Sequence, residues 1–199
     1  MKKILIEHVR HYWIIYLTLS CAFLTGAVFG AWGVGALEPK KATALSQFLN
    51  TLLEEQPKLI DPFFLKQLAK DNFLIMAGIW LLGLTVIGTP LIYLIVFTRG
   101  FVLGFTIVFI LHLKKLLGLG LVLITILIPS LVAIPCLLLG AGLATIFSFL
   151  LLQGKSNGRI LRQDFSYYCA ASLLISLGAA IAGVLQGYFS IVGGRFLVF

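Results

Sequence analysis

The chain has 199 residues, of which 60% are hydrophobic and only 11% are charged, and its mean hydropathy is +1.09. A soluble domain usually carries about 25% charged residues, so this chain has too few charges to cover a water-facing surface. Its apolar composition, the lack of a glycine period and only 3 Cys also exclude a disordered chain, a collagen-like chain and a disulfide scaffold. The composition predicts a polytopic membrane protein.

Long stretches without a charged residue mark the expected membrane spans. Asp, Glu, Lys and Arg are missing from residues 11–37, 72–98, 116–154 and 165–194. Each stretch reaches the roughly 20 residues that a helix needs to cross the hydrocarbon core. The stretches are continuously apolar rather than alternating, which favours helices over a β-barrel. The predicted fold is all-α, a polytopic transmembrane helical bundle with five spans, and six spans are the alternative.

The positive-inside rule gives the predicted elements their orientation across the membrane, because Lys and Arg gather in cytoplasmic loops. In chain order they are a basic cytoplasmic N-terminus (1–11), span one (12–36), an extracytoplasmic amphipathic loop (37–72), span two (73–97), span three (100–113), a short outer-leaflet or re-entrant helix (116–128), span four (131–152), a basic cytoplasmic loop (153–164), span five (166–189) and an extracytoplasmic tail (190–199). Arg99 is interpreted as a residue of the inner interface between spans two and three. Span one is longer than the apolar core of a signal peptide and is expected to be an uncleaved anchor.

Residues 37–72 form the one sizeable aqueous segment, with five basic and five acidic side chains. Its first half carries apolar residues at the spacing of one helix face. Pro57 ends that helix, and a second short helix begins near Phe63. The segment is either a hairpin on the outer membrane face, which the pattern favours, or a docking surface for an extracytoplasmic partner. The candidate contact residues are Leu45, Phe48, Leu49, Leu52, Leu53, Phe63 and Phe64, with Glu54, Glu55 and Lys58 at the rim.

Glycine and proline carry the most informative pattern within the spans. Three G-x-x-x-G spacings place small residues on one helix face and permit close backbone approach. These spacings are Gly26 with Gly30, Gly100 with Gly104, and Gly183 with Gly187. As a set they predict tight packing, either within the bundle or between protomers of a homo-oligomer. Gly88 and Pro90 are expected to kink span two, and Pro129 and Pro135 to break the fourth apolar segment.

Groups that carry out chemistry are sparse in the sequence. No acidic residue lies within a predicted span, although proton relays and ion-coupled transporters normally carry one. The histidines lack the further ligands of a metal site, and the cysteines fall in apolar spans where no disulfide is implied. The net charge of +8 suits membrane lipids better than nucleic acid as partners. We therefore expect no enzyme activity, no metal and no cofactor.

Three segments combine Gly, Pro and Trp in a recognisable order. Residues 77–90 read AGIWLLGLTVIGTP, residues 97–106 read FTRGFVLGFT, and residues 127–135 read LIPSLVAIP. They resemble, in turn, the W-x-L-G-x-S-V-I-G-x-P, F-x-[RK]-G-x-x-x-G-F-T and L-P-x-x-x-x-x-P signatures of the stage II sporulation protein M family. The wider superfamily often reads L-P-H-G-x-x-E-x-P at the third segment, whereas this chain has Ser130 and Ala133 there. The signatures indicate packing positions rather than chemistry, and they add Trp80 and Gly83 to the candidate packing residues.

The resemblance implies a role in endospore formation. Proteins of this family sit in the septal membrane and hold two wall-degrading enzymes, stage II sporulation proteins D and P, on its outer face. That complex thins septal peptidoglycan and drives the membrane around the forespore during engulfment. The resemblance implies that this chain is such a scaffold, and it raises the docking interpretation of residues 37–72 above the hairpin one.

The alternative function is a permease subunit that works with a separate ATPase. A small bundle with a proline-broken segment fits this class, and residues 153–164 would then couple to the ATPase. The apolar spans leave few side chains to line a hydrophilic path, which argues against a permease unless its substrate is a lipid or another hydrophobic molecule.

Overall fold

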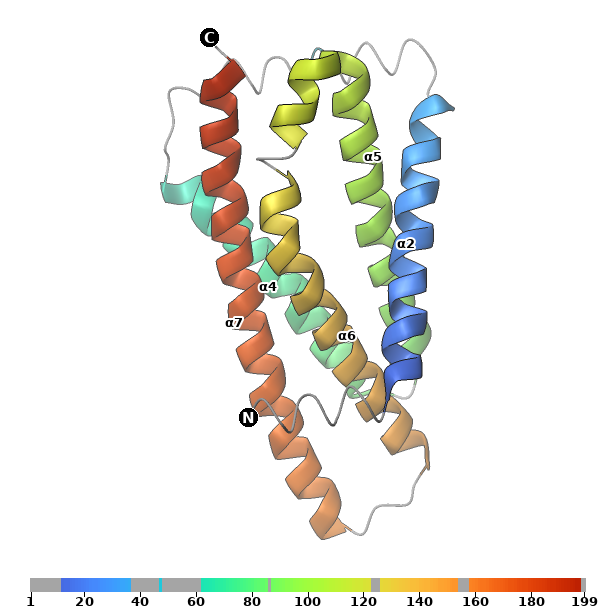
Figure 1. The fold of residues 1–199 in the computed structure, drawn as a ribbon. Helices are drawn as coiled ribbons and strands as arrows, with labels where there is room; N and C mark the ends of the chain where they lie inside the picture. The colour runs from blue at the N-terminus through green and yellow to red at the C-terminus, as the bar shows by residue number, and fades with distance from the viewer. Residues whose placement is uncertain are drawn as a thin grey trace.

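A computed structural model of the chain describes residues 12–36, 47, 62–85, 87–122, 126–153 and 158–197 (Figure 1). Within these ranges the side chains of residues 62–65, 113–125, 153, 158–164 and 190–197 are left undescribed. The long helices are α2 (Trp13–Gly35), α4 (Pro62–Gly83), α5 (Gly88–Val122), α6 (Ile128–Gln153) and α7 (Gly158–Leu197). The structure in the described ranges is entirely helical, which confirms the prediction of an all-α bundle.

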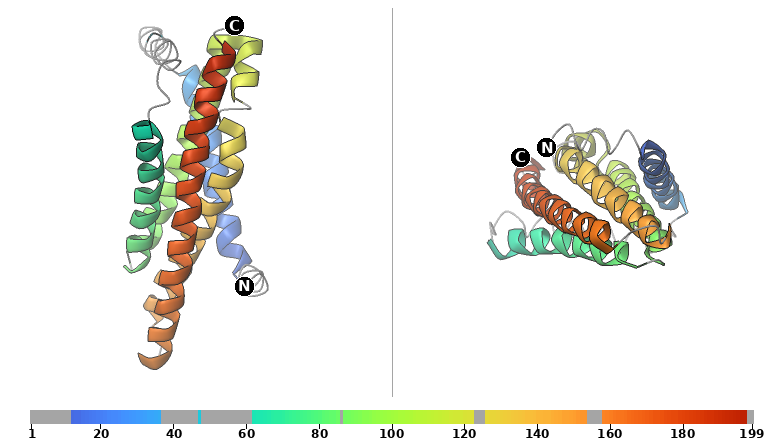
Figure 2. Two further views of the ribbon diagram at one scale, coloured as in Figure 1. Left: turned by 90° about the vertical axis from the view of Figure 1, so that its left-hand side faces the viewer. Right: turned by 90° about the horizontal axis from the view of Figure 1, so that it is seen from below.

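The five helices alternate in direction along the bundle (Figure 1). Helices α2, α5 and α7 begin at one end, where α4 and α6 finish; we call it the inner end, and the opposite one the outer end. Helix α2 packs against α5, α4 packs against α7, and α6 contacts all four of the others. Figure 2 shows the same bundle from the side and from below. The positive-inside rule predicts that the inner end faces the cytoplasm.

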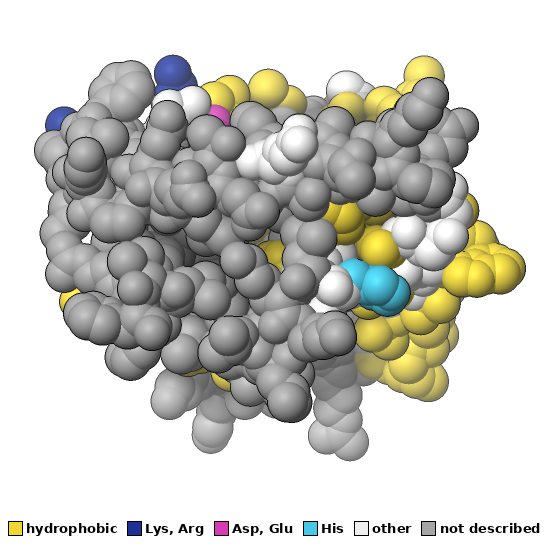
Figure 3. All heavy atoms as spheres, turned by 90° about the horizontal axis from the view of Figure 1, so that it is seen from above, with side chains coloured by type: hydrophobic (Ala, Val, Ile, Leu, Met, Phe, Trp, Pro, Cys, Tyr) yellow, Lys and Arg dark blue, Asp and Glu magenta, His cyan; other side chains and the backbone are white. Residues whose placement is uncertain are grey.

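Four of the described helices are long and apolar enough to cross a membrane. The apolar stretches are Trp13–Gly35, Gly88–His112, Ile128–Leu152 and Phe165–Phe189. Large apolar side chains point outward from them, among them Trp32, which is 77% exposed, and Leu131, which is 73% exposed. In the view from the outer end, hydrophobic side chains reach the surface where described residues are visible (Figure 3). A surface of this kind suits contact with lipid rather than water.

The largest correction to the sequence prediction concerns residues 73–113. The chain turns between the end of α4 at Gly83 and the start of α5 at Gly88, and α5 then continues past Arg99 to Val122. Spans at 73–97 and 100–113 are therefore not formed, and Arg99 lies near the middle of an apolar stretch rather than in a loop. The prediction failed because a charged residue was treated as the end of a span, although a bundle interior also accommodates one.

The turn between α4 and α5 is tight, and Gly88 and Pro90 help to set it. The N–H of Thr85 donates to the Leu82 carbonyl at 3.0 Å, and the N–H of Gly88 donates to the Thr85 carbonyl at 3.2 Å. A Cβ atom at Gly88 would overlap the Leu82 carbonyl. Pro90 occupies the first turn of α5, where its missing N–H costs no helical hydrogen bond. These residues thus begin a helix, which corrects the expected kink within span two.

The outer connection between α5 and α6 also differs from the prediction. Residues 116–122 are the last part of α5, which bends back at the outer end of the bundle (Figure 1), and α6 begins at Ile128. The helix expected at 116–128 is therefore joined to α5 and ends at Val122. Pro129 falls in the first turn of α6, where proline is tolerated. Pro135 lies inside α6 without ending it. The predicted break therefore lies before α6 and not between its two prolines.

Two other elements are longer than expected. Helix α4 begins at Pro62, so the predicted second short helix of the outer loop is the first part of α4. Helix α7 has 40 residues, about 60 Å at 1.5 Å per residue, and thus extends well beyond predicted span five. Its inner end projects past the other helices (Figure 2).

Candidate functional site

Two of the predicted glycine pairs meet across α2 and α5. The glycines are Gly26 and Gly30 on α2 and Gly100 and Gly104 on α5. A Cβ atom at Gly30 would overlap the Phe101 carbonyl, and one at Gly104 would overlap the Ala27 carbonyl. Such close approach of two backbones increases van der Waals contact, which drives helix association in lipid. The two G-x-x-x-G faces thus pack on each other within one chain.

The third glycine pair lies on α7. A Cβ atom at Gly183 would come within 2.8 Å of the Leu68 carbonyl oxygen on α4. Gly187, one turn further along α7, is buried. Gly183 therefore permits the close packing of α7 on the outer half of α4.

The candidate packing residues Trp80 and Gly83 lie where α4 meets α6 and α7. The Tyr168 hydroxyl donates to the Trp80 carbonyl at 2.9 Å, and a Cβ atom at Gly83 would overlap that hydroxyl. The Tyr168 ring stacks on Phe147 with a centroid distance of 4.3 Å. This cluster fixes the inner half of the bundle.

A buried hydroxyl on α6 joins that helix to the turn between α4 and α5. Ser148 is fully buried, and its hydroxyl donates to the Thr85 carbonyl at 2.8 Å. The Thr89 hydroxyl donates to the Ser148 oxygen at 3.1 Å. The two bonds hold the turn against α6.

Replacing Ser148 with Ala is expected to lower the stability of the bundle by about 1 kcal/mol, because interhelical hydrogen bonds in membranes contribute about that much. The thermal midpoint of the detergent-solubilised protein measures the loss. Ser176→Ala is the matched control, since the Ser176 hydroxyl is also buried but donates at 2.9 Å to the Leu173 carbonyl of its own helix. Equal midpoints for the two variants would show that Ser148 does not fix the turn.

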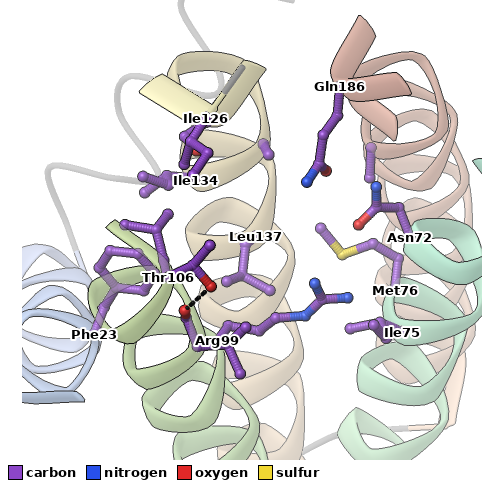
Figure 4. A pocket seen from close by; sticks show the side chains of 15 residues that line it. Phe23, Asn72, Ile75, Met76, Arg99, Thr106, Ile126, Ile134, Leu137 and Gln186 are labelled. Atoms are coloured by element: carbon purple, nitrogen blue, oxygen red, sulfur yellow. Dashed lines mark hydrogen bonds between the residues drawn. The ribbon is translucent and has the colours of Figure 1, made fainter. Parts of the chain in front are cut away.

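Polar side chains from three helices meet in a crevice in the outer half of the bundle. Asn72 of α4, Arg99 of α5 and Gln186 of α7 line it together (Figure 4). A cavity of about 160 Å³ lies beside them with a mainly apolar wall that includes Met76 and Leu137. A second, more open region of about 450 Å³ shares the three polar side chains. The two regions adjoin and form one crevice.

The crevice is rich in hydrogen-bond donors. Within the described part of the chain, no hydrogen bond or ion pair satisfies the side chains of Asn72, Arg99 and Gln186. A guanidinium carries five N–H donors, and each amide carries two. Asp71 borders the open region, and its negative charge acts on Arg99. The arrangement suits a ligand with acceptor oxygens, and the described residues hold no cluster of three metal-ligating side chains.

Most of the candidate partner-binding residues lie outside the described residues. They are Leu45, Phe48, Leu49, Leu52, Leu53, Glu54, Glu55 and Lys58. Phe63 and Phe64 belong to the first turn of α4, and their side chains are undescribed. Gln47 is helical and exposed.

Sequence reasoning missed the crevice. It placed Arg99 at the inner interface and left Asn72 and Gln186 without a role. The available signal was an uncharged residue with strong hydrogen-bonding groups in each of two stretches, since Asn72 begins the stretch 72–98 and Gln186 lies inside the stretch 165–194. Such residues usually face the interior of a bundle.

The chain matches a known protein family. The model of a protein family described as Stage II sporulation protein M matches residues 19–191. This range includes most of α2, all of α4, α5 and α6, and most of α7. No curated protein and no solved structure matches the chain at a significant level.

Proposed function

Because the chain belongs to the stage II sporulation protein M family, we propose that it is a non-enzymatic membrane scaffold that recruits and assembles peptidoglycan-degrading enzymes at the sporulation septum. The proposed partners are stage II sporulation proteins D and P. The assembled enzymes thin the septal wall, and the membrane then engulfs the forespore. The family match over residues 19–191 is the observation that carries this proposal.

The direction of the helices supports an outward docking role. Helix α2 ends and α4 begins toward the outer end of the bundle (Figure 1). Residues 37–61 connect these two helices in the sequence, and this connection supports a docking role for the contact residues proposed within them.

Fluorescence microscopy of sporulating cells tests the scaffold. A tagged copy of the chain is expected to gather at the septum, and a tagged hydrolase is expected to gather there with it. Deletion of the chain should disperse the hydrolase around the membrane, and re-expression should restore it. Septal hydrolase in the deletion strain would contradict the scaffold.

A permease subunit is the second candidate, and the crevice favours it. Asn72, Arg99 and Gln186 supply the polar groups within the membrane that the sequence pattern did not predict. In this case the chain is expected to bind a cytoplasmic P-loop ATPase at its inner end, near residues 153–164. Substitutions in the crevice would then abolish function without changing where hydrolases gather.

A further inference from the structure

Arg99 lies deep within the bundle. It follows the first residue of α5 by 11 positions, about 16 Å along the helix. Its side chain is half-buried and points into the crevice (Figure 4). A charged side chain at this depth is costly unless it pairs with another group. The side-chain amides of Asn72 and Gln186 add further hydrogen-bond donors. The three residues together therefore suit a ligand that supplies acceptor oxygens.

The outer half of α4 carries charged side chains that precede Asn72. Lys66 and Lys70 are exposed, and they precede Asn72 by less than two turns. The apolar part of α4, residues 72–83, is about 18 Å long, against a hydrocarbon core of about 30 Å. A short span is accommodated by local thinning of the bilayer and by snorkelling side chains. Local thinning at α4 is therefore expected to bring headgroups of the outer leaflet toward Asn72.

The open region of the crevice also begins beside Asn72. Leu74, which lines it, is 54% exposed. The cavity of about 160 Å³ is too small to admit a partner helix, whose diameter is about 10–12 Å. It is close to the apolar cavity of about 150 Å³ that accepts a benzene molecule. The open region has room for a headgroup, and the cavity has room for part of a hydrocarbon chain.

The two charges at the crevice indicate which class of lipid headgroup it binds. Arg99 carries a positive charge and Asp71, at the open rim, carries a negative one that acts on it. We propose that the crevice between α4, α5 and α7 binds a zwitterionic aminophospholipid, with its phosphate at Arg99, Asn72 and Gln186 and its ammonium at Asp71. An anionic headgroup without an ammonium would be repelled by Asp71, and so it binds more weakly.

Native mass spectrometry of the full chain in detergent tests this site with three added lipids. Phosphatidylethanolamine, phosphatidylglycerol and phosphatidylcholine with identical acyl chains are the probes. The wild-type protein is expected to retain phosphatidylethanolamine most strongly. Arg99→Gln should weaken that retention about tenfold, the equivalent of about 1.4 kcal/mol. Asp71→Asn should remove the preference for phosphatidylethanolamine over phosphatidylglycerol.

Two comparisons keep the test decisive. Asp71 is exposed, so Asp71→Asn is expected to fold even if Arg99→Gln does not. Lys70→Gln is the matched control, because Lys70 is an exposed neighbour that does not line the crevice, and it should leave the lipid preference unchanged. Equal retention of the three lipids by the wild-type protein would overturn the proposal. Displacement of bound lipid by inorganic phosphate alone would assign the site to free phosphate and overturn it as well.

Discussion

Replacing Gly104 with Ala is expected to destabilise the bundle by about 2–3 kcal/mol, the upper range for overpacking a close-packed interface. The added Cβ atom would overlap the Ala27 carbonyl, which belongs to the backbone of α2 and has no rotamer that moves it away. Gly30→Ala should give a similar loss, because its Cβ atom would overlap the Phe101 carbonyl. Either variant forces α2 and α5 apart along their whole contact.

The thermal midpoint in detergent and the amount of protein in the membrane both measure this loss. Gly78→Ala is the matched control, since Gly78 lies within α4 and a Cβ atom there would meet no other atom within 4 Å. That variant is expected to keep or slightly raise stability, because Ala favours a helix over Gly by up to about 1 kcal/mol. If Gly104→Ala and Gly78→Ala behaved alike, the α2–α5 contact would not hold the bundle together.

The double variant Leu49→Asp with Leu52→Asp is expected to abolish hydrolase recruitment while the chain still inserts into the membrane. Both residues lie on the apolar face predicted for the outer segment. Burial of each leucine at an interface contributes about 1.5–3 kcal/mol, so loss of both weakens binding by more than about a hundredfold. Co-purification of the hydrolases from sporulating cells measures the effect.

A second double variant separates the apolar face from the added charge. Asn50→Asp with Thr51→Asp introduces the same two charges between the predicted contact residues without removing an apolar side chain. It is expected to recruit hydrolases as the wild-type chain does. Normal recruitment by the Leu49→Asp, Leu52→Asp variant would remove this segment from the docking surface.

Much of the fold follows from hydropathy along the chain. The apolar stretches predict a membrane bundle, and α2 and α6 lie where the stretches at 12–36 and 131–152 place them. The prediction failed around Arg99 because a local pattern cannot tell a charge at a membrane surface from one that faces other helices. It also missed the turn between α4 and α5, because no charged residue and no proline stands between Gly83 and Gly88.

The candidate packing residues also show what a local sequence pattern cannot predict. The spacing of Gly26 with Gly30 predicts a close helix contact, but only the three-dimensional arrangement shows that Gly100 and Gly104 form the other side. The crevice was beyond reach for a similar reason. Asn72, Arg99 and Gln186 are far apart in the sequence, and the alternating directions of α4, α5 and α7 bring them to one level.

The most direct test of the scaffold is a crosslinked affinity purification of the tagged chain from sporulating cells, with the partners identified by mass spectrometry. Recovery of the wall hydrolases stage II sporulation proteins D and P is the predicted result. Recovery of a cytoplasmic P-loop ATPase without any wall hydrolase would contradict the scaffold and identify the chain as a transporter subunit.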